Sequence, residues 1–91
     1  MLSIIPYDSV DQAVAMANDT VYGLAAHIQG RDSATIRDVA ARLRCGQVHV
    51  NHPAWSPHAP FGGYKQSGNG REFGVEGLDE YLETKAVLGL D

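Results

Sequence analysis

The sequence predicts an α/β layer architecture, and three observations along its first half support this prediction. Two stretches repeat apolar residues at helical spacing, three stretches are short and β-prone, and the two kinds of stretch alternate. We expect the order β-α-β-α-β over residues 2–51, followed by a loop rich in proline and glycine, a short helix and a C-terminal strand. A chain of 91 residues has room for one domain, so residues 1–91 are predicted to form a single domain.

The chain opens with a β-prone stretch over residues 2–7, and a helix is predicted directly after it. Pro6 removes a backbone donor, which ends this first strand or places it at a sheet edge. Ser9 and Gln12 have the spacing of a capping box, in which each side chain pairs with the backbone N–H of the other residue. An apolar stripe at helical spacing follows at Val10, Ala13, Val14 and Ala17.

A second strand and a second helix are predicted next. Residues 24–29 form a β-prone run that ends at Gly30. The helix begins at Asp32 or Ser33, and we expect Gly46 to end it in the left-handed conformation that glycine favours. Its apolar face consists of Ile36, Val39, Ala40 and Leu43.

A third strand is predicted over residues 47–51, where apolar and polar side chains alternate strictly. Because successive side chains of a strand point to opposite faces, Val48 and Val50 should face a core. His49 and Asn51 should then lie on the other face.

The composition changes after this strand. Residues 51–71 hold three of the four prolines, the single tryptophan and a cluster of glycines. A loop of this length is uncommon inside a compact domain and is usually functional. We then expect a short helix over residues 75–83 and a last strand over residues 85–90.

Composition excludes several functional classes. A net charge of −4 argues against nucleic-acid binding, because nucleic-acid binders present basic surfaces. One cysteine excludes an internal disulfide framework and a zinc site built from several thiolates. No apolar run approaches the ~18 residues that cross a bilayer, and the first residues do not resemble a signal peptide. We therefore expect a soluble, cytoplasmic chain that binds neither nucleic acid nor membrane.

The residues alone predict no catalytic or metal site. Cys45 follows the C-terminal end of a predicted helix, where the helix dipole disfavours a thiolate. The four histidines lack the spacing of metal ligands on one face. The glycines of residues 68–74 do not have the spacing or the preceding strand of a dinucleotide-binding loop. Carboxylates on the last helix form a charged run that is typical of a solvated face.

One string in the loop is nevertheless specific. Residues 60–72 read Pro-Phe-Gly-Gly-Tyr-Lys-Gln-Ser-Gly-Asn-Gly-Arg-Glu and match every fixed position of the C-terminal signature of the NAD(P)-dependent aldehyde dehydrogenases. Further segments that resemble this family follow in its order, from Ile5-Pro-Tyr through Gly46-Gln-Val-His-Val-Asn51 to Lys85-Ala-Val. The resemblance covers residues 4–90, so the chain is similar to about the last fifth of an aldehyde dehydrogenase and to the C-terminal part of its catalytic domain.

The resemblance implies a chemistry that most of this chain does not carry. In the family a cysteine thiolate attacks the aldehyde, a hydride passes to the nicotinamide, and a glutamate activates the water that hydrolyses the thioester. The nucleophile, the base and the cofactor domain all lie upstream of the matching region. The resemblance therefore implies no catalytic residue, no metal and no cofactor bound by this chain alone, and NAD or NADP as the cofactor of the full-length enzyme.

Several site residues are implied by matching positions. Phe61 matches an aromatic residue that lines the aldehyde entry tunnel, and Trp55 lies near a second aromatic residue on the substrate side. Asn51 ends the strand that leads into the active-site loop. The loop glycines are expected to turn the backbone tightly beneath the nucleophile, at Gly62, Gly63, Gly68 and Gly70. Structural ion or hydrogen-bond partners are expected at Lys65, Arg71 and Glu72.

The resemblance also implies partners. The chain would pack against the rest of a dehydrogenase subunit or against a second copy of itself. Residues 85–91 resemble a strand that lies against a neighbouring subunit and are a candidate oligomerisation strand, with an internal edge strand as the alternative. A second hypothesis for the whole chain is a free-standing, non-enzymatic interaction or dimerisation module derived from this family.

Overall fold

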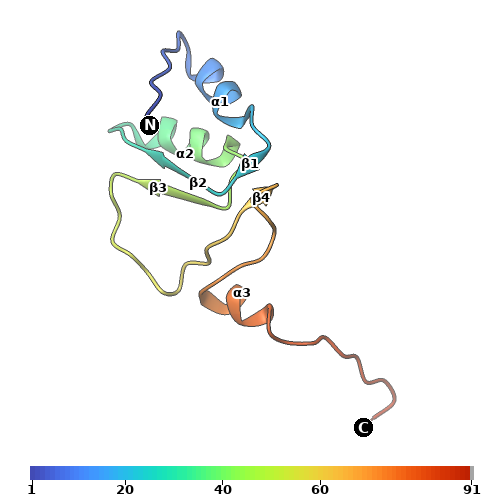
Figure 1. Ribbon diagram of the computed structural model, residues 1–91. Helices are drawn as coiled ribbons and strands as arrows, with labels where there is room; N and C mark the ends of the chain where they lie inside the picture. The colour runs from blue at the N-terminus through green and yellow to red at the C-terminus, as the bar shows by residue number, and fades with distance from the viewer. Residues whose placement is uncertain (91) are drawn as a thin grey trace.

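The computed structural model describes residues 1–90 and contains helices and short strands in a mixed α/β arrangement (Figure 1). The predicted α/β class is confirmed. In chain order the elements are α1 (Val10–Asn18), β1 (Tyr22–Gly23), β2 (Ala25–Ile28), α2 (Ser33–Arg42), β3 (Gln47–Val50), β4 (Tyr64–Lys65) and α3 (Gly74–Asp79).

Helix α1 begins where the sequence predicts it. The backbone N–H of Gln12 donates to Ser9 Oγ at 3.1 Å, so Ser9 is the N-cap. The second half of the predicted capping box differs, because Gln12 Oε1 accepts from the N–H of Asp8 at 2.6 Å and not from Ser9. The apolar stripe of α1 includes Val14, which is 5% exposed.

Helix α2 is capped by Asp32, whose carboxylate accepts from the Thr35 hydroxyl and from the backbone N–H of Ala34. These hydrogen bonds, the Thr35 bond first, lower the pKa of Asp32 below its usual value of 3.8. The prediction that Gly46 ends this helix in a left-handed conformation was wrong. The helix ends at Arg42 and is followed by Leu43 with an extended backbone (φ −73°, ψ 129°), and Gly46 is not among the residues with positive φ.

Strands β2 and β3 form a parallel pair joined by α2, with Ala25 opposite Gln47 and Ile28 opposite Val50. Helices α1 and α2 lie on the same side of this pair in Figure 1. Arg42 of α2 ties the two helices together through an ion pair with Asp11 of α1 at 2.9 Å. The opposite side of the β2–β3 pair faces the proline-rich loop.

The second strand pair connects distant parts of the chain. β1 pairs with β4 in antiparallel register, with Tyr22 opposite Lys65 and Gly23 opposite Tyr64. The N–H of Gln66 extends the pairing by donating to the Val21 carbonyl at 2.8 Å. This pair holds the glycine-rich loop against the segment that follows α1.

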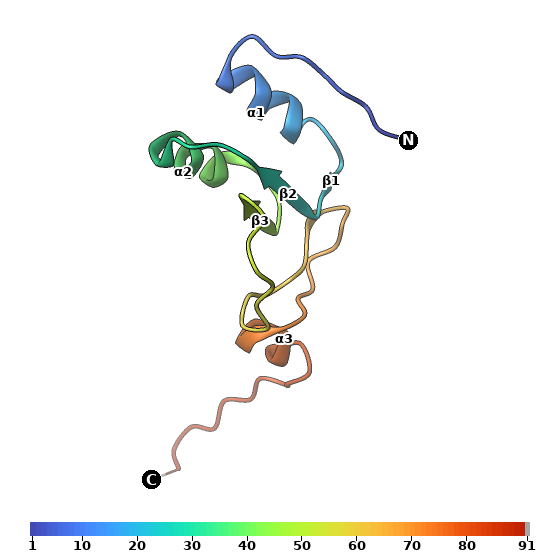
Figure 2. The same ribbon diagram turned by 90° about the vertical axis from the view of Figure 1, so that its left-hand side faces the viewer.

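Three predicted elements are corrected by the structure. Residues 2–7 and residues 85–90 are not strands, and the helix predicted over residues 75–83 spans only Gly74–Asp79. β-prone sequence becomes a strand only when another strand supplies hydrogen-bond partners, and neither end of the described chain has one. Both ends are open to solvent, with Leu2 87% and Leu88 91% exposed, and Figure 2 shows the C-terminal segment extending away from α3.

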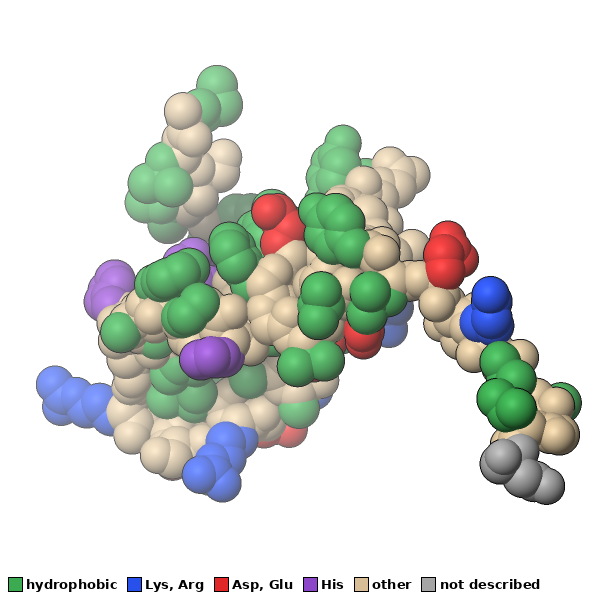
Figure 3. Space-filling model, turned by 90° about the horizontal axis from the view of Figure 1, so that it is seen from below, with side chains coloured by type: hydrophobic (Ala, Val, Ile, Leu, Met, Phe, Trp, Pro, Cys, Tyr) green, Lys and Arg blue, Asp and Glu red, His purple; other side chains and the backbone are tan. Residues whose placement is uncertain are grey.

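The described chain leaves much of its apolar surface uncovered. A folded monomer of 9.8 kDa exposes about 5,200 Å², whereas this chain exposes 7679 Å². Its radius of gyration is 17.2 Å, compared with about 12 Å for a compact domain of this length. Figure 3 shows hydrophobic side chains spread over the face seen from below. Val14 is the one buried hydrophobic side chain among the described residues, and it still keeps 5% exposure.

Candidate functional site

A hollow of about 650 Å³ lies between the β2–β3 pair and the loop that follows β3. We call it the aromatic hollow. Its strand side includes His27 and His49, which stack with ring centroids 4.8 Å apart. Its loop side carries three aromatic side chains, Trp55, Phe61 and Phe73. The hollow therefore combines an apolar wall with a polar floor, as small-molecule sites commonly do.

Asn51 closes the end of the β2–β3 pair from which the loop departs. Its side chain bonds Gly30 in both directions, because Asn51 Oδ1 accepts from the Gly30 N–H at 3.0 Å and Asn51 Nδ2 donates to the Gly30 carbonyl at 2.9 Å. Asn51 and His52 both adopt the left-handed region, with φ of 50° and 54°. Asparagine tolerates this conformation better than most residues. Asn51 thus turns the chain out of β3 and towards the aromatic residues.

Phe61 is held at the hollow by an isolated antiparallel bridge to Glu72. The Phe61 N–H donates to the Glu72 carbonyl at 2.8 Å, and the Glu72 N–H donates to the Phe61 carbonyl at 2.7 Å. Gln47 Nε2 also donates to the Pro60 carbonyl at 3.2 Å, which fixes the residue before Phe61 against β3. The structure therefore places Phe61 and Trp55, the two residues with an implied substrate role, around one hollow.

The sequence did not indicate Phe73. Its ring meets the Trp55 ring edge to face, with centroids 5.8 Å apart and an interplanar angle of 87°. Its backbone has φ 66° and ψ 161°, a region that side-chain-bearing residues rarely adopt and that costs about 1–3 kcal/mol. No local sequence signal marks such a conformation, because a bulky residue is the least expected type there.

The loop glycines differ in what they contribute. A Cβ on Gly62 would lie 2.0 Å from the Gly70 carbonyl oxygen, and one on Gly63 would lie 2.5 Å from Ser67 Cβ. Gly68 has a φ of +93°. Gly70 has neither a positive φ nor a neighbour closer than 4.0 Å, so a tight turn is not what requires glycine there. Gly46, which lies outside the loop, does require glycine for space, since an added Cβ would lie 1.5 Å from the Gly62 oxygen.

The two cationic side chains of the signature, Lys65 and Arg71, donate hydrogen bonds to backbone carbonyls. Lys65 Nζ donates to the carbonyls of Asn18 at 2.8 Å and Thr20 at 3.1 Å. Arg71 Nη1 donates to the Gly63 carbonyl at 2.9 Å and to the carbonyls of two adjacent loop residues. Glu72 contributes its backbone to the bridge with Phe61. These contacts give Lys65 and Arg71 a role in holding the loop in place.

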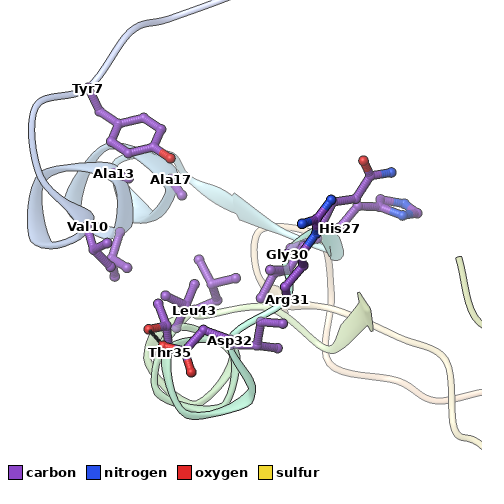
Figure 4. A pocket seen from close by; sticks show the side chains of 16 residues that line it. Tyr7, Val10, Ala13, Ala17, His27, Gly30, Arg31, Asp32, Thr35 and Leu43 are labelled. Carbon is purple, nitrogen blue, oxygen red and sulfur yellow. Dashed lines mark hydrogen bonds between the residues drawn. The ribbon is translucent and has the colours of Figure 1, made fainter. Parts of the chain in front are cut away.

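A second cavity of about 470 Å³ lies between α1, α2 and β2 (Figure 4). Its lining is mostly aliphatic and includes Val10 and Leu43, and the aromatic Tyr7 also contributes to it. The one carboxylate in the wall belongs to Asp32, which is already engaged in capping α2. This cavity is a gap between two layers and offers no set of reactive groups.

The thiol and the imidazoles are not gathered into a reactive cluster. Cys45 Sγ lies 3.5 Å from the Gln47 carbonyl oxygen and is not part of the hollow wall. His49 Nε2 pairs with Gln47 Oε1 at 2.7 Å, and His52 Nε2 pairs with the Gln29 amide nitrogen at 2.6 Å. Over residues 1–90, no group of three or more histidine, cysteine, aspartate or glutamate side chains is placed to hold a metal ion. No helix within the described residues is long and apolar enough to cross a membrane.

Comparison with known proteins identifies the family. Residues 1–87 match the aldehyde dehydrogenase family. The chain belongs to this family. A Staphylococcus epidermidis protein that carries an aldehyde dehydrogenase name is 45% identical over 89 residues, which are 98% of this chain and 19% of that protein. The chain thus spans about a fifth of the length of the relatives it matches.

Solved aldehyde dehydrogenases share the arrangement described above. A cysteine-to-alanine mutant of aldehyde dehydrogenase C from Pseudomonas syringae, crystallised with NAD⁺ and octanal, is 67% identical over 93% of this chain and 18% of its own chain, with a TM-score of 0.90. The dehydrogenase KauB from Pseudomonas aeruginosa is 44% identical over 94% of this chain and 18% of its own, with a TM-score of 0.89. In these two solved proteins, the part that resembles this chain makes up 18% of a much longer chain.

Proposed function

We propose that this chain is the C-terminal part of an aldehyde dehydrogenase catalytic domain whose full-length form oxidises an aldehyde to a carboxylate with NAD or NADP. The observation that carries the proposal is the family match, which runs over residues 1–87. A single cysteine outside the hollow and an acidic net charge fit a cytoplasmic enzyme of this kind.

The large exposed surface of this chain indicates that another part of the protein covers it. The chain exposes 7679 Å², roughly 2,500 Å² more than a compact monomer of its mass. We infer that the rest of the same subunit covers the apolar surface that this chain leaves exposed. The extended residues 85–90 would then add to a strand of a neighbouring subunit, which makes the enzyme a homo-oligomer.

The chain alone should be inactive. The family's nucleophile, base and cofactor domain correspond to upstream segments, and Cys45, whose thiol lies by the Gln47 carbonyl, is not part of the lining of the aromatic hollow. NADH formation from a panel of aldehydes tests this expectation on the 91-residue chain. Turnover that Cys45→Ser abolishes would contradict it.

The aromatic hollow supports an apolar aldehyde as the substrate class. Trp55, Phe61 and Phe73 give the hollow an aromatic wall, and aromatic walls favour apolar chains over charged ones. The Pseudomonas syringae relative was crystallised with octanal. We therefore propose that the hollow forms part of the entrance for a medium-chain aliphatic aldehyde.

A hybrid enzyme tests the proposed function directly. In the Pseudomonas syringae dehydrogenase, with the cysteine that the crystallised mutant lacks restored, the segment that matches this chain is replaced by the chain itself. The same cysteine-bearing parent without the replacement serves as the control. We expect the hybrid to keep NAD-dependent oxidation of octanal, because the two segments are 67% identical. A hybrid that assembles like its parent but does not oxidise octanal would contradict the proposal.

Phe61→Ala in the hybrid tests the substrate assignment. Removing the ring enlarges the hollow, so the preference for octanal over propanal should fall by an amount that corresponds to about 1–3 kcal/mol. The measurement is the ratio of the two kcat/KM values. An unchanged ratio would remove Phe61 from the aldehyde path.

The alternative, a free-standing interaction module, makes a different prediction. A segment severed from its parent should self-associate through its exposed apolar surface and be molten or aggregate. An evolved module should instead be a monomer at high concentration with a sharp cooperative melt. In-frame DNA upstream of the Met1 codon that continues into a nucleophile-bearing segment would settle the choice for the dehydrogenase.

A further inference from the structure

We propose that Phe73 is a positioning residue that holds the Trp55 ring over the aromatic hollow and thereby sets the length of aldehyde that the enzyme prefers. The proposal rests on the proposed function and goes beyond it by naming a wall residue that the family resemblance did not single out. It is carried by three observations: how the Phe73 backbone is fixed, how it is strained, and what its ring touches.

The Phe73 backbone is fixed on both sides by the two walls of the loop. On one side, Glu72 is bonded to Phe61 through two hydrogen bonds of 2.8 and 2.7 Å. On the other side, the Gly74 N–H donates to the Pro57 carbonyl at 3.1 Å. Phe73 therefore lies between a residue that is bonded to Phe61 and a residue that is bonded to Pro57, two positions after Trp55.

The backbone next to Phe73 is closely packed. A Cβ on Gly74 would lie 2.7 Å from the His58 carbonyl oxygen, and a Cβ on Gly77 would lie 2.7 Å from the Glu72 carbonyl carbon. Phe73 itself adopts φ 66°, ψ 161°, a conformation that suits glycine. A phenylalanine in such a position indicates that its ring is needed, because glycine would occupy the same backbone without strain.

The ring of Phe73 restrains Trp55. Trp55 is 73% exposed and Phe73 is 45% exposed, so within the described chain the edge-to-face contact at 5.8 Å is a principal restraint on the indole. Both rings belong to the wall of the hollow together with Phe61. Since Trp55 and Phe61 approach the hollow from opposite ends of the turn 55–61, the position of the indole sets how far an extended alkyl chain reaches.

The test uses the hybrid dehydrogenase with octanal and propanal as long and short probes. Phe73→Ala should raise the ratio of the KM for octanal to the KM for propanal by about twofold to tenfold, the range that one aromatic pair contributes. In the Trp55→Ala background the same change should have no further effect, because Phe73 acts through Trp55. Phe73→Tyr keeps the ring and should keep the octanal preference.

Two further variants separate positioning from folding. Phe73→Leu keeps most of the apolar volume without the ring, and it should lose the octanal preference without loss of assembly. Phe73→Gly relieves the positive φ, so it should raise thermal stability while losing the preference. Equal losses for octanal and propanal, or additive effects of Phe73→Ala and Trp55→Ala, would overturn the proposal and leave Phe73 with a structural role.

The control variants distinguish this proposal from the proposed function. If Phe61→Ala and Trp55→Ala change the octanal preference but Phe73→Ala does not, only the role of Phe73 is overturned. If none of the three variants changes it while the hybrid remains active, the aromatic hollow is not the aldehyde path and both assignments fall. If the hybrid is inactive although assembled, the proposed function itself fails.

Discussion

Residues 10–50 and residues 51–90 of this chain are organised by different kinds of interaction. Apart from the two-residue β1, which pairs with β4, the first region forms α1, β2, α2 and β3, whose caps and apolar faces lie within a few residues of one another in the sequence. The second region has only a two-residue strand, one bridge and a six-residue helix. Its shape depends on glycines and on side chains that bond distant backbone atoms. Local signals specify the first region, and contacts over a long sequence separation specify the second.

The two regions meet at a few close contacts. Gly46, just before β3, faces Gly62 in the loop, and Lys65 reaches back to the carbonyls that end α1. Within the first region, the Asn18 side chain bonds the backbones of Arg42 and Arg44 at 2.9 Å each, which fixes the carbonyl that Lys65 reaches. Disturbing these contacts should separate the two regions, whereas disturbing a cap should affect the first region alone.

The largest effect is expected for Gly46→Ala. The added methyl would lie 1.5 Å from the Gly62 oxygen, so β3 and the loop must move apart, at a cost of about 3 kcal/mol or more. Octanal oxidation and assembly of the hybrid dehydrogenase measure the loss. Gly70→Ala is the matched control, because its Cβ meets nothing closer than 4.0 Å. Equal behaviour of the two variants would show that the Gly46 contact does not join the regions.

A smaller effect is expected for Lys65→Met. The variant removes two hydrogen bonds from a charged amine to the carbonyls of Asn18 and Thr20, while the backbone φ of 56° stays the same. Such bonds contribute about 1.5–3 kcal/mol. Hydrogen exchange of the hybrid should therefore accelerate in peptides that contain β1 and the end of α1. Lys85→Met, in the exposed tail, serves as the control, and matching exchange rates would refute the prediction.

Ser9→Ala should affect only the first region. The Gln12 N–H loses its acceptor at 3.1 Å, which costs about 1 kcal/mol at a helix N-cap. Amides in the first turn of α1 should exchange about fivefold faster in the hybrid, with no change around the aromatic hollow. Ser3→Ala lies in the exposed N-terminal segment and should change nothing. Faster exchange in the hollow would show that the two regions are more tightly coupled than their contacts indicate.

The smallest effect concerns the charge of Asp32. Hydrogen bonds from Thr35 and Ala34 lower its folded pKa below 3.8, so the carboxylate stabilises α2 above that pH. This stabilisation is lost as the pH falls through the lower, folded pKa. A peptide of residues 30–45 should lose helical ellipticity as the pH falls from 3.8 through the folded pKa of Asp32. An Asp32→Asn peptide should lose less ellipticity, because the amide still caps the helix and does not titrate. Identical pH profiles would exclude this titration.

The sequence predicted the first region well and the second region only in part. Both helices and the strands β2 and β3 lie where caps and periodicity place them. Residues 2–7 and 85–90 have the composition of strands but lack a partner, which composition cannot reveal. Of the implied site residues, Trp55 and Phe61 do meet at one hollow, whereas Gly70 is not held there by tight packing.

Family membership, helix caps and apolar faces follow from the sequence, because each depends on residues at short and regular spacing. The strained backbone of Phe73, the need for glycine at Gly46 and the carbonyl partners of Lys65 emerged only once the chain was folded. Each of these features depends on two segments that are distant in sequence and within a few ångströms in space. No local sequence pattern predicts which distant segments come into contact. These contacts between distant segments place the aromatic side chains around the hollow.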